Sequence, residues 1–99
     1  MQIEINNQLF EWNDDKAALN VIKHGVYFED AALVFNDRNR IEKYDLAHSV
    51  DEDRWLTIGM VNSILCVIYT ERGEATRLIS ARKATPQEKR EYYDHQKIH

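Results

Sequence analysis

The central apolar run of this chain, ILCVIY at residues 64–69, constrains the fold most, because both of its alternating sets of side chains are apolar. Successive side chains of a β-strand point to opposite faces of a sheet, so such a strand needs a cover on each face. Two similar runs flank it, RWLTIGMV at 54–61 and ATRLISARK at 75–83, and both links between the runs are of hairpin length. The sequence therefore predicts a three-stranded antiparallel meander that is covered on both faces.

The segment before this meander predicts two helices. The first is expected over residues 14–24, because Asn13 is a typical N-cap and Gly25 can adopt the left-handed conformation that ends a helix. The second is expected over residues 26–37, where apolar side chains recur along one stripe.

Three further segments complete the expected order of elements. Residues 3–12 alternate roughly and contain an Asn-Asn turn pair, so they predict a strand or hairpin. Residues 37–53 are polar and predict a loop with room for one strand. A terminal helix is expected over 86–96, because Thr85 and Glu88 form a capping box around a first-turn proline.

The predicted fold class follows from this order. It is α+β, with an antiparallel sheet, two N-terminal helices on one face and a short C-terminal helix, in a single domain spanning residues 1–99. The terminal helix is polar nearly all round, with Tyr92 and Tyr93 as its main apolar surface. This helix or a partner chain must cover the second face of the sheet.

Composition narrows the classes of function. The net charge of −4 argues against broad, non-specific nucleic-acid binding, although basic residues crowd the last third of the chain. The single cysteine, Cys66, excludes an internal disulfide or a cysteine metal cage. We recognise no signal peptide, membrane-length apolar run or glycine-rich phosphate loop. We therefore expect a cytoplasmic protein with no cofactor and no catalytic metal.

Two groups of basic residues are candidates for chemistry. Lys23 and His24 end the first helix, where they suit the helix dipole but could also hold a phosphate or move a proton. Arg54, Arg77 and the Arg82-Lys83 pair lie on or beside the predicted strands, and arginine binds phosphate bidentately. The adjacent His48-Ser49 pair is no indication of a hydrolase triad.

Most of the chain, from about Phe10 to Tyr93, resembles the BrnT family of type II toxins. The resemblance is carried by FEW, KHGV-x-FE-x-A, HS-x-x-E-x-R, YTERG and R-x-ISARKAT in this order and spacing. It implies a RelE/ParE-like fold, ribonuclease activity that blocks translation, and a cognate BrnA-like antitoxin. That antitoxin would also bind the operon's DNA, in an autoregulatory hetero-oligomer with the toxin.

The resemblance also implies roles for the basic residues. The leading hypothesis is a metal-independent endoribonuclease that leaves a 2′,3′-cyclic phosphate on its RNA substrate. Lys23 or His24 would assist proton transfer, while Arg54 and Arg82 would stabilise the charge that develops on the phosphate. The predicted RNA-binding residues are Arg72, Arg77 and Lys83.

Two other readings stay open on the sequence. ParE-like relatives share the fold without cutting RNA, so the chain could inhibit a protein target such as DNA gyrase. It could also be an inactive partner of a DNA-binding antitoxin. Arrest of DNA synthesis before protein synthesis would indicate the first alternative, and absence of toxicity would indicate the second.

Overall fold

The computed structural model describes residues 1–98 and contains six strands and three α-helices. Helix α1 spans Asp14–His24 and has the predicted ends. The Asn13 side chain accepts a hydrogen bond from the Lys16 backbone N–H at 3.0 Å. Gly25 has a φ of +69° and its N–H donates to the Val21 carbonyl at 2.8 Å. The first predicted helix is therefore confirmed at both ends.

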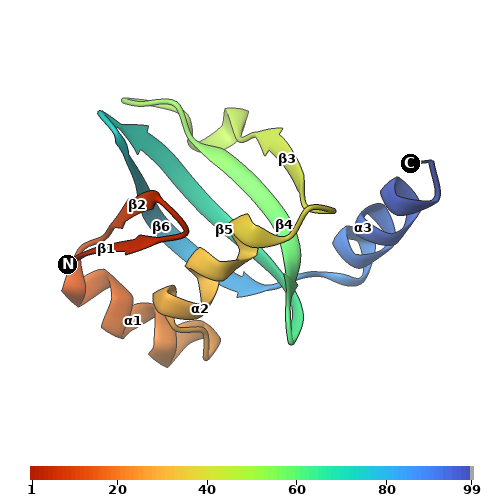
Figure 1. Cartoon of the computed structure of the whole chain (residues 1–99), viewed down its shortest axis with the longest axis horizontal. Coiled ribbons are helices and arrows are strands. Elements are labelled where there is room, and N and C mark those ends of the chain that lie inside the picture. Colours follow the sequence, from red (N-terminus) through yellow and green to blue (C-terminus); the bar gives the residue numbers. More distant parts are fainter. Residues whose placement is uncertain (99) are drawn as a thin grey trace.

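The sheet is mixed and has the strand order β1-β2-β6-β5-β4-β3 (Figure 1). Its strands are β1 (Gln2–Ile5), β2 (Gln8–Glu11), β3 (Ile41–Tyr44), β4 (Trp55–Val61), β5 (Ser63–Arg72) and β6 (Ala75–Lys83). The predicted hairpin and the β4-β5-β6 meander are both confirmed.

The prediction of a purely antiparallel sheet is wrong, because β2 pairs with β6 in parallel over Leu9–Glu11 and Ala75–Arg77. This pairing joins segments more than sixty residues apart, so no turn signal in the sequence marks it. It adds the N-terminal hairpin to one edge of the meander, and β3 adds a strand to the other edge.

The predicted helix over 26–37 is shorter in the structure. Helix α2 spans Phe28–Ala32 and continues as a 3₁₀ helix, η1, over Leu33–Asn36. This segment lies so close to β4 that a Cβ on Gly59 would stand 2.7 Å from Val34 Cγ1. The chain then leaves the helical region at Asp37, whose carboxylate accepts hydrogen bonds from the Met60 N–H at 2.8 Å and the Tyr92 hydroxyl at 2.5 Å. Tight packing on the sheet therefore ends the helix early.

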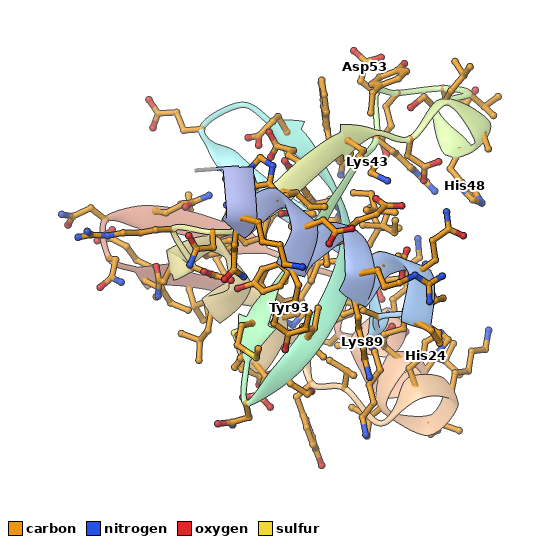
Figure 2. All side chains as sticks on the ribbon, turned by 90° about the vertical axis from the view of Figure 1, so that its right-hand side faces the viewer. His24, Lys43, His48, Asp53, Lys89 and Tyr93 are labelled. Carbon is orange, nitrogen blue, oxygen red and sulfur yellow. The ribbon has the colours of Figure 1, made fainter. Side chains whose placement is uncertain are left out.

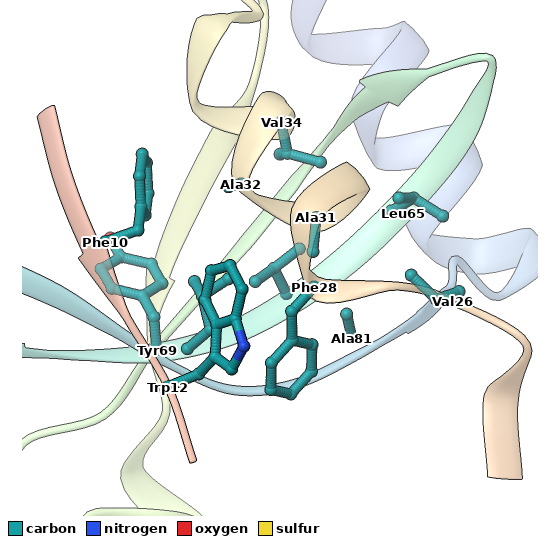
Figure 3. Close-up of a cluster of buried hydrophobic side chains, with 12 residues drawn as sticks. Phe10, Trp12, Val26, Phe28, Ala31, Ala32, Val34, Leu65, Tyr69 and Ala81 are labelled. Carbon is teal, nitrogen blue, oxygen red and sulfur yellow. The ribbon is translucent and has the colours of Figure 1, made fainter. Parts of the chain in front are cut away.

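The central strand separates two hydrophobic clusters, as its sequence predicted. In the first cluster, Leu65 and Val67 of β5 pack with α2, η1 and the aromatic residues Phe10 and Trp12 (Figure 3). In the second cluster, Cys66 of β5 packs with residues of β4 and with Tyr92 of the terminal helix. Since adjacent residues of a strand face opposite sides, the two clusters lie on opposite faces of the sheet.

The terminal helix, α3, spans Pro86–Ile98 and covers only part of the second face. The predicted terminal helix is confirmed at its start, and it extends two residues beyond the expected end at residue 96. Figure 1 shows α3 well apart from α1 and α2. Tyr92 is buried, whereas Tyr93 is 49% exposed. The predicted capping box is present, with Thr85 and Glu88 exchanging hydrogen bonds at 2.8 and 3.2 Å.

Candidate active site

A β-bulge in β6 shapes the uncovered part of the second face. Tyr69 lies opposite Leu78, whereas the preceding Ile68 lies opposite Ser80, so Ile79 is the extra residue. Ile79 and Ser80 are half-buried, and both line two neighbouring cavities. The bulge thus places the apolar side chain of Ile79 and the hydroxyl group of Ser80 between these cavities.

The first of these, here called the arginine cavity, has a volume of about 250 Å³. Arg54, immediately before β4, and Arg82, on β6, both line it. Its remaining lining residues are Asp45, His48, Leu56, Ile68, Ile79 and Ser80. The structure therefore brings together the two arginines that were predicted to stabilise a phosphate.

Arg82 is held in place by the first turn of α3. Its two terminal nitrogens donate to the two carboxylate oxygens of Glu88 at 2.7 and 3.1 Å. These hydrogen bonds lower the pKa of Glu88 to about 2 and raise the pKa of Arg82. Arg82 is thus an oriented cation at the edge of the cavity.

Arg54 is less completely paired. Its Nη2 lies 3.9 Å from Glu52 Oε1, at the limit of an ion pair, and Arg72 Nη2 lies 3.3 Å from the other oxygen of the same carboxylate. The Nε of Arg54 is buried and has no hydrogen-bond partner among the described residues. Arg54 is therefore less fully hydrogen-bonded than Arg82. Glu52 thus lies between Arg54 and Arg72 and contacts both.

A histidine and an aspartate that the sequence argument left out of the site complete this cavity. The 3₁₀ helix η2 (Leu46–His48) presents His48, whose Nδ1 lies 2.9 Å from Asp45 Oδ2. His48 is 67% exposed, whereas Asp45 is mostly buried. A carboxylate at Nδ1 orients the imidazole and leaves Nε2 directed elsewhere. The D-x-x-H spacing of Asp45 and His48 could have predicted that the two side chains contact each other. Only the structure of the loop shows that both line this cavity.

Ser49 fixes this loop to the start of β4. Its hydroxyl donates to the Asp45 carbonyl at 2.6 Å and accepts from the Arg54 N–H at 2.9 Å. The Asp45 N–H also donates to the Arg54 carbonyl at 2.9 Å. Ser49 thus positions the loop. The hydrogen bonds of Asp45 and Ser49 with the backbone of Arg54 fix the loop that carries His48 beside Arg54.

The second cavity, here called the α1 cavity, has a volume of about 290 Å³. It is lined by Lys16, Leu19, Asn20, Lys23, His24, Ile79 and Ser80. Lys23 and His24 therefore adjoin the arginine cavity across the bulge and do not line it. Figure 2 shows the face that carries α3, with His48 and His24 labelled toward its right-hand edge.

Asn20 is the residue that joins α1 to the bulged strand. Its side-chain amide donates to the Ala81 carbonyl at 2.8 Å and to the Val26 carbonyl at 2.9 Å. Its side-chain oxygen accepts from the Ala81 N–H at 3.0 Å. The pairing of β2 with β6 ends at Arg77. Further along the same edge of β6, Asn20 takes the place of a strand and forms hydrogen bonds with the backbone N–H and carbonyl of Ala81. This contact sets the position of the Lys-His end of α1 beside Ser80.

The three predicted RNA-binding residues line neither cavity. Arg77 projects from β6 and binds Glu11 of β2 at 2.7 Å. Arg72 lies at the end of β5 and binds Glu52. Lys83 lines a separate cavity with Val26, Leu65 and other residues. Their predicted contacts with RNA stay predictions.

Within residues 1–98, no three His, Cys, Asp or Glu side chains are grouped so as to hold a metal ion. In the same part of the chain, no helix is long and apolar enough to span a membrane. The arginine cavity offers two guanidinium groups, an oriented imidazole and an apolar floor. This set of groups can bind a phosphodiester, stabilise negative charge on it and move a proton beside it.

Comparison with known proteins defines the class. Residues 12–88 match the family described as the ribonuclease toxin, BrnT, of type II toxin-antitoxin systems. The chain therefore belongs to the BrnT family of ribonuclease toxins. It is similar to the 1.1 Å crystal structure of the Brucella abortus ribonuclease toxin BrnT, with 28% sequence identity and a TM-score of 0.57. The similarity covers 77% of this chain and 95% of the Brucella chain. No curated protein sequence matches this chain.

Proposed function

We propose that this ribonuclease toxin cleaves RNA in the arginine cavity without a metal ion. The observation that carries the proposal is the convergence of Arg54, Arg82 and the Asp45-oriented His48 on one open part of the sheet. The two guanidinium groups supply positive charge and hydrogen-bond donors at the position where a phosphate would bind.

The proposed reaction is a transesterification within the RNA strand. His48 accepts the proton of the ribose 2′-hydroxyl, and the 2′-oxygen attacks the adjacent phosphorus. The bond from phosphorus to the 5′-oxygen breaks, and that oxygen takes a proton from water. Arg54 and Arg82 donate hydrogen bonds to the non-bridging oxygens as the negative charge on them increases. The products are a 2′,3′-cyclic phosphate and a 5′-hydroxyl end.

The cellular role is part of the same proposal. Membership of a type II family implies an antitoxin partner. We propose a BrnA-like, DNA-binding antitoxin in a hetero-oligomer, and inhibition of translation in the cytoplasm by RNA cleavage. We also assign the fold to the RelE/ParE-like superfamily. The order of strand pair, helices, antiparallel meander and terminal helix supports this assignment.

Cleavage of single-stranded RNA by the purified chain, with EDTA present, tests the chemistry. We expect the variants Arg54→Gln and His48→Ala to lose roughly 10²–10³-fold in rate, as removal of one such group typically does. Arg90→Gln is the matched control, because Arg90 is exposed and lines neither cavity. Full activity of both site variants, or cleavage abolished by EDTA, would contradict the mechanism.

Pulse labelling after induction of this chain tests the cellular role. An early fall in protein synthesis with continued replication is expected for RNA cleavage. An early fall in DNA synthesis would instead support a protein target such as gyrase, and would overturn the proposal.

A further inference from the structure

The α1 cavity contains positive charge that the rest of the protein does not neutralise. Lys16, Lys23 and His24 line it, and within the described residues none of the three forms an ion pair with a carboxylate. The arginine cavity differs, because Arg54 and Arg82 there are paired with Glu52 and Glu88. Within the described residues, the ammonium groups of Lys16 and Lys23 are therefore free to bind an external anion.

These cations share one side of α1. Lys16, Asn20 and Lys23 are spaced four and three residues apart, so their side chains lie in line along the helix. The side-chain nitrogen and oxygen of Asn20 already form hydrogen bonds with the backbone of Val26 and Ala81. An anion in this cavity would consequently be bound by the lysine and histidine side chains and not by the amide.

The backbone of α1 does not help to bind an anion here. The cavity extends along the side of α1 from Lys16 to the C-terminal residue His24, where the helix dipole is negative. Any affinity for a phosphate must therefore come from the side chains, and substitutions that remove their charge should abolish it.

The walls of the α1 cavity also offer apolar surface. Leu19 is 50% exposed although it is a large hydrophobic residue, and Ile79 on the bulge is half-buried. The flat face of a nucleobase can pack against such side chains once it is unstacked from its neighbours. The cavity thus combines charge for a phosphate with an apolar surface for a base.

The two cavities adjoin each other at β6, because Ile79 and Ser80 line both of them. We propose, on the basis of the proposed function, that the α1 cavity binds the nucleotide next to the cleaved step of a single-stranded RNA. Lys16, Lys23 and His24 hold its phosphate, and Leu19 and Ile79 contact its base. Lys23 and His24 then contribute to substrate binding, while the chemistry takes place beyond Ser80.

Steady-state cleavage of a short oligoribonucleotide with one mapped cleavage step tests this assignment. Two truncated substrates are needed, each of which keeps the two nucleotides joined by the cleaved bond and lacks the nucleotides beyond them on one side. We expect Lys23→Gln to raise KM roughly tenfold on the full oligonucleotide, as loss of a charged hydrogen bond implies, with kcat unchanged. The plot of log kcat/KM against log salt concentration has a negative slope, and the magnitude of this slope should decrease by about 0.7 when one phosphate contact is lost.

The truncated substrates separate binding from chemistry. The truncation that removes the nucleotide bound in the α1 cavity should raise KM for the unsubstituted protein. On that substrate, the unsubstituted protein and Lys23→Gln should have the same KM. The variant Arg38→Gln is the matched control, because Arg38 is exposed, forms no ion pair within residues 1–98 and lines neither cavity. It should leave KM and the salt slope unchanged.

Each contrary result has a distinct meaning. A fall in kcat for Lys23→Gln on all three substrates would show a catalytic role and overturn the subsite. Insensitivity of KM to both truncations would also overturn it, while leaving the ribonuclease intact. Absence of cleavage by the unsubstituted protein would overturn the proposed function, and the subsite with it.

Discussion

Replacement of Asn20 by alanine should lower the free energy of unfolding by about 3 kcal/mol, at about 1 kcal/mol for each buried hydrogen bond lost. The Asn20 side chain makes three such bonds, at 2.8, 2.9 and 3.0 Å, and the residue is only 5% exposed. The substitution leaves the Val26 carbonyl and both backbone groups of Ala81 without this partner. Unsatisfied buried polar groups carry the main cost.

The consequence is measurable by thermal and urea unfolding followed by circular dichroism. For a domain of this size, each kcal/mol corresponds to about 4–8 °C in Tm, so a fall of roughly 12–24 °C is expected. Because Asn20 sets the position of α1 beside Ser80, KM for RNA should rise in the same variant at temperatures where it remains folded.

The exposed Asn36 provides a control on η1, since Asn36→Ala removes an amide that makes no side-chain hydrogen bond within residues 1–98. Its effect on the free energy of unfolding should stay within about 0.5 kcal/mol. A loss below about 1 kcal/mol for Asn20→Ala would refute the reasoning, because it would mean that water or a local shift satisfies the freed groups.

Three other substitutions test separate contacts. The pKa of Glu88 is lowered by Arg82 from 4.5 to about 2, so the stabilisation from this pair is present above pH 4.5 and lost as the pH falls toward 2. Glu88→Gln should flatten the acid dependence of stability in that window and cost about 1–2 kcal/mol at neutral pH after allowance for solvent screening. Gly59→Ala should destabilise by about 1–3 kcal/mol through overpacking against Val34, and equal urea midpoints would refute the close approach. Tyr92→Phe removes the hydrogen bond to Asp37 and should lower the free energy of unfolding by about 1–2 kcal/mol in urea titrations, whereas an unchanged midpoint would show that the bond contributes nothing.

The candidate site shows how far residue patterns lead without a fold. Arg54 and Arg82 could be selected because they lie on or beside strands of one meander and because arginine binds phosphate bidentately. His48 could not be placed, because its loop has no regular period that would predict its position. Ile79 and Ser80 carried no signal, since a β-bulge is set by the pairing of two strands and not by a residue type.

The sequence by itself determined the features whose interactions are local. The caps of α1 and α3 depend on contacts between residues three or four apart, and the meander depends on alternating apolar side chains and short links. The apolar character of both sides of β5 likewise determined that each face would be covered.

Only the tertiary structure decided the features that join distant segments. The parallel pairing of β2 with β6 and the contact of Asn20 with Ala81 each span more than sixty residues. Such contacts form because a strand edge or a buried amide must be satisfied by whichever group the packed chain brings near. The packed fold likewise decides that His48, Arg54 and Arg82 line one cavity and that Lys23 lines the adjoining one.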